Sequence, residues 1–172
     1  LPRDRCGSAE TEHPFTTHFN KWDVRITTHY AENDVADSMY SVIHEGGHAH
    51  YEMGIDPQYI YSPVGSASSM SLHESQSRFY ENLLGRSREF VGYVFPKAKE
   101  CFPDQLKKYT AEDFYKAINL VAPSLIRTEA DEVTYALHIM VRYELEKRIM
   151  NGELAVRELP EARAALYREY LG

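Results

Sequence analysis

The sequence has few of the features that mark disulfide-rich, membrane-spanning or nucleic-acid-binding proteins. Its 172 residues include only two cysteines, Cys6 and Cys101, which are far apart and show no ligand-like spacing, so a disulfide scaffold is not expected. No apolar run approaches the roughly 18 residues that cross a bilayer, and no charged-then-apolar signal segment opens the sequence. The formal net charge of −7 argues against nucleic acid or an anionic membrane as the main partner.

What is present is ordinary globular composition. Hydrophobic residues make up 43% and charged residues 26%, and the length suffices for one compact domain with a core. The chain begins with Leu1 rather than methionine and ends on Tyr170-Leu171-Gly172, which has the character of a helix stop. We therefore expect a segment of a longer product.

Local patterns predict a mostly helical chain with a small β element. Residues 1–20 are rich in proline, threonine and histidine and are predicted to be extended or loop, whereas the alternating, β-branched stretch 22–30 predicts a strand. Caps, apolar periodicity and glycine or proline stops predict the helices. Their expected ranges are 35–53, from the serines at 66–71 to 84, 87–101 with an interruption at Pro96, 110–121, 124–150, and 160–171.

The strongest chemical signal is His44-Glu45-Gly46-Gly47-His48, inside the helix predicted for 35–53. Histidines at i and i+4 share one helix face, so both imidazoles can reach one ion at about 2.0–2.1 Å. Glu45 can then take a proton from water that zinc has acidified. Two surface histidines on a solvated helix are the alternative. Against it, each mid-helix glycine costs about 1 kcal/mol relative to alanine, which indicates that something approaches this backbone closely.

A catalytic zinc needs a third protein ligand and an open position. Glu52 is four residues after His48, but its phase carries it away from His44, and His50 points to another face. Glu74 lies on the next predicted helix, and an antiparallel return of the chain would bring it to the metal. We select Glu74, with an ordinary surface glutamate as the alternative. Groups that could orient the ligands are Asp37, Ser41 and Glu81, among which the sequence does not choose.

A polar stripe runs along the helix predicted for 124–150. Its members recur at steps of three and four residues and are Arg127, Asp131, Tyr135, His138 and Arg142. The pattern alone favours a solvated face with ion pairs, and His138 alone is more typical of a structural histidine than of a ligand. The functional alternative is an arginine that pairs with a substrate carboxylate.

Several segments together resemble the carboxypeptidase Taq family of metallocarboxypeptidases. They are His13-Pro14-Phe15, Asp23-Val24-Arg25-Ile26-Thr27, the motif at 44–48, His73-Glu74-Ser75-Gln76 and Ile126-Arg127-Thr128-Glu129-Ala130-Asp131. They fall in the family's order and span nearly the whole sequence. Only the motif at 44–48 carries weight by itself, but the ordered set is highly specific.

The resemblance implies a helical fold with a deep groove, similar to neurolysin-like and angiotensin-converting-enzyme-like peptidases. It implies broad-specificity removal of C-terminal residues from peptides, zinc replaceable by cobalt, and cytoplasmic homodimers. The implied metal ligands are His44, His48 and Glu74, with Glu45 as general base and Arg127 as the residue that recognises the substrate's terminal carboxylate. His13, Asp23 and Arg25 are implied to line the groove and bind substrate.

The sequence also departs from the family pattern. The motif GxxQDxHW and a long N-terminal helical region, both typical of the family, are absent. Residues 1–172 are therefore interpreted as one central catalytic segment. The missing motif would help to bind substrate and stabilise an oxyanion. This leaves two alternatives to a carboxypeptidase: an inactive segment or interaction module that retains the metal site, and a zinc endopeptidase or aminopeptidase.

Overall fold

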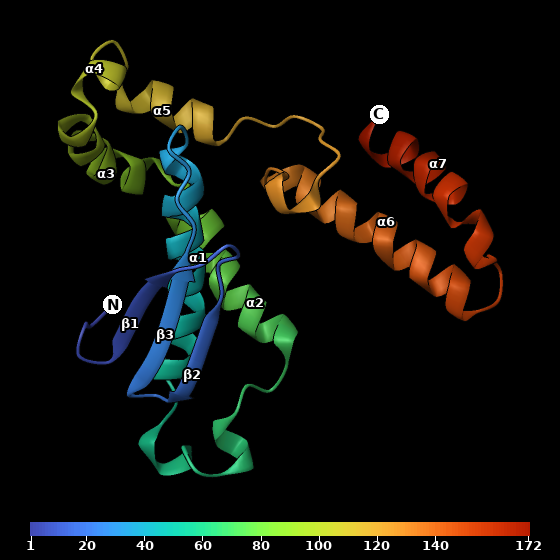
Figure 1. The fold of residues 1–172 in the computed structure, drawn as a ribbon, viewed down its shortest axis with the longest axis horizontal. Coiled ribbons are helices and arrows are strands. Elements are labelled where there is room, and N and C mark those ends of the chain that lie inside the picture. The colour runs from blue at the N-terminus through green and yellow to red at the C-terminus, as the bar shows by residue number, and fades with distance from the viewer. The chain divides into compact units, whose positions relative to one another are not determined.

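The computed structural model describes all residues from Leu1 to Gly172, which form two compact units, Leu1–Ile118 and Asn119–Gly172. The first unit contains a three-stranded sheet and most of the helices, whereas the second is a helical hairpin (Figure 1). This confirms the predicted mainly α class with a small β element. None of the helices combines the length and the apolar character needed to span a membrane.

The sheet of the first unit has the strand order β1-β3-β2. Strand β1 (Cys6–Glu10) is parallel to β3 (Asp23–Thr28), and β2 (Thr16–Asn20) is antiparallel to it, with an irregularity between His18 and Asn20. The strand predicted at 22–30 is thus confirmed as β3. Residues 1–20 were predicted to be extended or loop, and their extended parts form the short, largely exposed strands β1 and β2.

Helix α1 (Val35–Met53) packs against one face of this sheet (Figure 1). Val24 and Ile26 of β3 are buried against Ala49 of α1. The helix has the predicted bounds because its end signals are local: the Asp34 carboxylate accepts from the first-turn amides, and Gly54 caps the C-terminus. Apolar periodicity predicts a stripe of Val35, Met39, Val42 and Ile43 on this helix, but Val35 and Val42 are exposed and Met39 and Ile43 are only half-buried.

The second predicted helix is continuous, but it changes from an α-helix to a π-helix. Helix α2 (Met70–Arg78) begins at its N-cap Ser69 and continues directly into a π-helical segment, η3 (Phe79–Gly85). Together they cover the range predicted to end at residue 84. π-Helical turns are rare and often occur at functional sites. Here the turn carries Glu81, which faces the site described below.

Three further α-helices belong to the first unit: α3 (Arg88–Cys101), α4 (Pro103–Leu106) and α5 (Ala111–Ile118). Helix α3 continues through Pro96 rather than stopping there. The sequence pattern of Thr110 and Asp113 resembles a capping box, and the structure confirms it, since the backbone N–H of each residue donates to the other's side chain. Helix α5 ends three residues before the predicted position of 121.

The second unit consists of α6 (Glu132–Met150) and α7 (Leu159–Leu171), packed through Val141, Leu145, Leu154 and Leu166. Gly152, with φ of 73°, ends α6 as predicted. The predicted start at 124 is wrong. Asp131 caps α6 by accepting from the N–H groups of Val133 and Thr134, and also accepts from the Ala122 N–H, so residues before it form a loop with a short 3-10 turn, η4 (Arg127–Glu129).

Candidate metal centre

Three side chains from α1 and α2 converge on one point. The Glu74 Oε2 atom lies 3.5 Å from His44 Nε2 and 3.4 Å from His48 Nε2. Donor atoms held about 2.1 Å from a tetrahedral ion are separated by about 3.4 Å, so these spacings suit one metal. Two imidazoles and one carboxylate are the ligands that Zn²⁺ uses in catalytic sites, with a fourth position left open. The donor set therefore fits a metal ion.

Close backbone packing brings Glu74 to the two histidines. A Cβ atom built on Gly47 would lie 2.6 Å from the Cα of Ser77, so only glycine allows α2 to approach α1 this closely. A Cβ atom built on Gly46 would make only an ordinary contact, at 3.7 Å from the Leu1 side chain. The close approach predicted from the paired glycines is therefore confirmed for Gly47 and not for Gly46.

Carboxylates and arginines surround the first histidine. Glu81 Oε2 is 2.8 Å from His44 Nδ1, and Glu81 itself is held by Arg78 at 3.0 Å and Arg86 at 3.6 Å. Arg78 also donates to the outer oxygen of Glu74, Oε1, at 3.0 Å, which leaves Oε2 turned toward the histidines. Of the three orienting groups considered from sequence, Glu81 thus makes direct contact with a ligand.

This arrangement shifts the protonation of the metal-free site. Burial alone would lower the pKa of His44, but hydrogen bonds to Glu74 and Glu81 outweigh it and raise that pKa to about 9. Burial would raise the pKa of Glu74, but its contacts with the two histidines and Arg78 hold it well below the usual range. The Glu81 pKa is lowered in the same way. Without metal, His44 is therefore protonated at neutral pH, while the Glu74 and Glu81 carboxylates are ionised.

Glu45 is held from the sheet side. Its carboxylate is buried, and Oε2 lies 2.5 Å from the Thr16 hydroxyl of β2, which is also 3.1 Å from the Glu45 carbonyl. Thr16 was missed from sequence because it falls in the stretch 1–20, which was predicted to be extended or loop without a defined partner. Only its pairing in β2 opposite Ile26 brings it under α1.

The two other residues considered as third ligand, His50 and Glu52, do not belong to the metal centre. The exposed His50 stacks on Tyr80 with ring centroids 5.1 Å apart, and Glu52 is buried in contact with His73 and His18. Neither belongs to the group of donor atoms that could share an ion, which consists of His44, His48 and Glu74.

The predicted substrate-binding residues occupy separate places. Asp23 and Arg25 form a two-point ion pair at 2.9 and 3.0 Å, and alternation along β3 puts them on the sheet face opposite α1. His13 is exposed between β1 and β2. Their assignment as substrate-binding residues stays a prediction.

Arg127 lies in the second unit, where its guanidinium donates to the Tyr135 hydroxyl. It lines a cavity of about 430 Å³ together with Arg142, Arg163 and Tyr167. His138, from the same predicted stripe, is fully buried against Tyr167, with His138 Nδ1 3.1 Å from the tyrosine oxygen. The stripe is therefore not a solvated face along its whole length.

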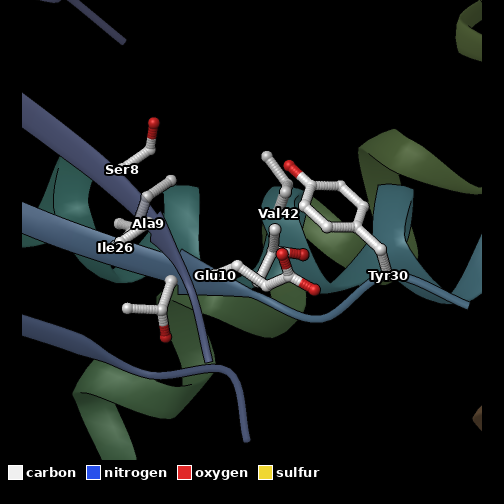
Figure 2. Close-up of a pocket in the computed structure, with 8 residues that line it drawn as sticks. Ser8, Ala9, Glu10, Ile26, Tyr30 and Val42 are labelled. Atoms are coloured by element: carbon white, nitrogen blue, oxygen red, sulfur yellow. The ribbon is translucent and has the colours of Figure 1, made fainter. Parts of the chain in front are cut away.

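A second cavity, of about 280 Å³, lies between the sheet and α1. Figure 2 shows Glu10, Tyr30 and Val42 extending into the same space. It is lined by none of the three candidate metal ligands, so it has no direct part in the metal centre.

The chain matches known proteins along almost its whole length. Residues 3–172 match the sequence profile described as carboxypeptidase Taq (M32) metallopeptidase. The chain belongs to the carboxypeptidase Taq family. Membership in this metallopeptidase family implies a metal cofactor, in agreement with the His44, His48 and Glu74 cluster.

Individual relatives agree with this assignment. The chain is 47% identical to carboxypeptidase 1 of Bacillus subtilis over 95% of its residues, and 50% identical to thermostable carboxypeptidase 1 of Thermus thermophilus over 94%. It superposes on the crystal structure of the M32 carboxypeptidase from Deinococcus radiodurans with a TM-score of 0.97, at 47% identity and 99% coverage. The chain spans 32% of the two curated relatives and 34% of the crystallised one.

Proposed function

We propose that this chain is the catalytic segment of a zinc carboxypeptidase that removes C-terminal residues from peptides with broad specificity. The observation that carries the proposal is the convergence of His44, His48 and Glu74, whose ligand atoms all lie within 4.8 Å of one another. Zinc bound there would acidify water and polarise the scissile carbonyl. The relatives named carboxypeptidase support the direction of cleavage.

Glu45 is proposed as the general base. It directly follows the first ligand, and the Thr16 hydroxyl fixes its carboxylate. Glu45 takes the proton from the attacking water and then delivers it to the leaving amine. Because Glu45 Oε2 already accepts a hydrogen bond from the Thr16 hydroxyl, the other oxygen, Oε1, is the one suited to carry this proton.

Arg127 is proposed as the anchor for the terminal carboxylate. A guanidinium can bind a carboxylate through two parallel hydrogen bonds, which fixes both the position and the orientation of the chain end. Holding the end in this way places the last peptide bond for attack. The two further arginines of the same cavity, Arg142 and Arg163, make its surroundings favourable for an anion.

The decisive experiment replaces Glu45 with glutamine in the intact protein. The expected result is a loss of about 10²- to 10⁴-fold in kcat with one metal ion still bound per chain. Activity near that of the wild type with the metal retained would exclude the general-base role. Loss of both metal and activity would place Glu45 among the ligand-supporting groups instead.

The products of a defined peptide distinguish the alternatives. Release of single C-terminal residues supports the proposal, whereas internal fragments or N-terminal residues would indicate an endopeptidase or aminopeptidase. One metal per chain without hydrolysis would indicate an inert segment. The cytoplasmic homodimer, the replacement of zinc by cobalt, and the neurolysin-like groove stay predictions from the family resemblance. Light scattering and metal analysis of the intact protein check the oligomer and the metal.

A further inference from the structure

His73 lies directly beside a candidate ligand without belonging to the ligand set. Its Nδ1 is 2.6 Å from His48 Nδ1, and its Nε2 is 2.7 Å from Glu52 Oε1. The exposed fraction is 12% for the His73 side chain and 3% for Glu52. Glu52 therefore has little access to water, and its nearest partners are histidines: His73 on Oε1 and the more exposed His18 on Oε2, at 3.3 Å.

A metal on His48 would fix the direction of these hydrogen bonds. His48 turns Nε2 toward Glu74, so a metal bound at Nε2 would leave the proton on Nδ1. His48 Nδ1 would then donate to His73 Nδ1, which accepts. A neutral His73 then carries its own proton on Nε2 and donates it to the Glu52 carboxylate. The chain of donors runs in one direction, from His48 through His73 to Glu52.

Ring packing holds the middle member in place. The His73 ring stacks on Tyr51, with centroids 4.5 Å apart and planes at 30°, and it meets the His48 ring at 4.7 Å. Tyr51 and Glu52 are neighbours on α1, whereas His73 comes from α2. The ring is thus oriented by one stacking contact and two hydrogen bonds.

We propose that His73 and Glu52 form a hydrogen-bond relay that sets the tautomer and orientation of His48 and thereby strengthens metal binding. The inference rests on the proposed metal site. It makes the two histidine ligands unequal: His44 is supported directly by the Glu81 carboxylate, whereas His48 reaches its carboxylate through an imidazole. Hydrogen bonds of this kind to ligating histidines typically change metal affinity 10- to 100-fold.

The test compares His73→Gln with His73→Leu in the intact protein. A glutamine amide can accept from His48 and donate to Glu52, whereas leucine fills similar space and does neither. The zinc dissociation constant is measured at one pH by competition with a chromophoric chelator. The visible spectrum of the cobalt-loaded protein reports the ligand field independently of activity. His50→Leu is the matched control, because it removes an imidazole from α1 that contacts Tyr80 and no ligand.

The expected result is a dissociation constant about 10- to 100-fold higher for His73→Leu, with a shifted cobalt spectrum. His73→Gln is expected to stay within about threefold of the wild type, and His50→Leu to match it. Wild-type affinity in His73→Leu, or equal weakening in both His73 variants, would overturn the relay. If His73→Leu does not fold, Glu52→Gln against Glu52→Leu gives the same comparison, since only glutamine keeps an acceptor oxygen for His73. A wild-type protein that binds no zinc would instead refute the metal site itself.

Discussion

The backbone of Gly47 passes so close to Ser77 that a side chain of any size on Gly47 would meet the Ser77 Cα at 2.6 Å. The neighbouring atoms are backbone atoms of Gln76 and Ser77, at 3.0 and 3.2 Å, and cannot rotate away. This contact sets the distance between the helix that carries two candidate ligands and the helix that carries the third. The distance between the candidate ligands on α1 and Glu74 on α2 therefore depends on residue 47 being a glycine.

Gly47→Ala is expected to push α2 away from α1. Overpacking of this kind typically destabilises by about 1–3 kcal/mol, and separation of Glu74 from the histidines should weaken zinc binding at least tenfold. Gly46→Ala is the matched control, because it meets only an ordinary contact and gains up to about 1 kcal/mol of helix propensity. Chemical denaturation and chelator competition measure both effects. Equal behaviour of the two variants would show that the close approach does not control the site.

The Thr16 hydroxyl should matter for turnover rather than for metal content. Thr16→Val removes the hydrogen bond to the Glu45 carboxylate while keeping the shape of the side chain, and Thr16→Ser restores the hydroxyl. A hydrogen bond to a charged group contributes about 1.5–3 kcal/mol, so kcat should fall roughly 10- to 100-fold in the valine variant. Bound zinc, measured by elemental analysis, should not change. Full activity in Thr16→Val would exclude Thr16 as a positioning residue.

The α1 helix and its motif could be predicted because their signals are local. The Asp34 cap, the Gly54 stop and the i,i+4 histidines all lie within one element. Glu74 lies outside that element: it was selected by assuming an antiparallel return of the chain, and the family resemblance supported that choice. Strand β1 was missed because its stability comes from parallel pairing with β3, beginning at Cys6 opposite Val24, rather than from its own sequence.

The supporting groups around the ligands could not be inferred in the same way. Thr16 comes from β2, and His73 and Arg78 come from α2, so all three lie outside the helix that carries His44 and His48. His73 was visible only as the neighbour of Glu74, yet in the fold it contacts the other ring nitrogen of His48 and the Glu52 carboxylate. The start of α6 was misplaced for a related reason: Asp131 has the spacing of a helix-face residue, but its carboxylate caps the helix instead.

The stability of the metal-free protein should decrease as the pH rises from 6.5 to about 9. The pKa of His44 is raised from 6.5 to about 9 in the fold. Its contribution to the free energy of unfolding is therefore complete below pH 6.5 and is lost as the pH rises through 9. The upper bound is about 3 kcal/mol. Glu74 and Glu81, whose pKa values are lowered, contribute above their ordinary pKa and lose that contribution only in acid, so they do not oppose this change.

Urea denaturation in the presence of a chelator, at pH 6 and at pH 9.5, measures this loss. His44→Gln is the control and should show a smaller difference between the two pH values. Zinc affinity should change in the opposite direction, rising over the same range, because the metal must displace the His44 proton. A pH-independent zinc affinity between 6.5 and 9 would contradict the raised pKa.

Arg127→Ala should discriminate between free and blocked chain ends. Loss of a charged, two-point contact with the terminal carboxylate should reduce kcat/KM for a free peptide roughly 10- to 100-fold. The same peptide with a C-terminal amide lacks the carboxylate and should be hydrolysed slowly by both proteins, with little further loss in the variant. Arg157→Ala, which removes an exposed arginine of the same unit outside the cavity, is the control. Equal losses on the two peptides would show that Arg127 supports the fold of its unit, through Tyr135, rather than the substrate's chain end.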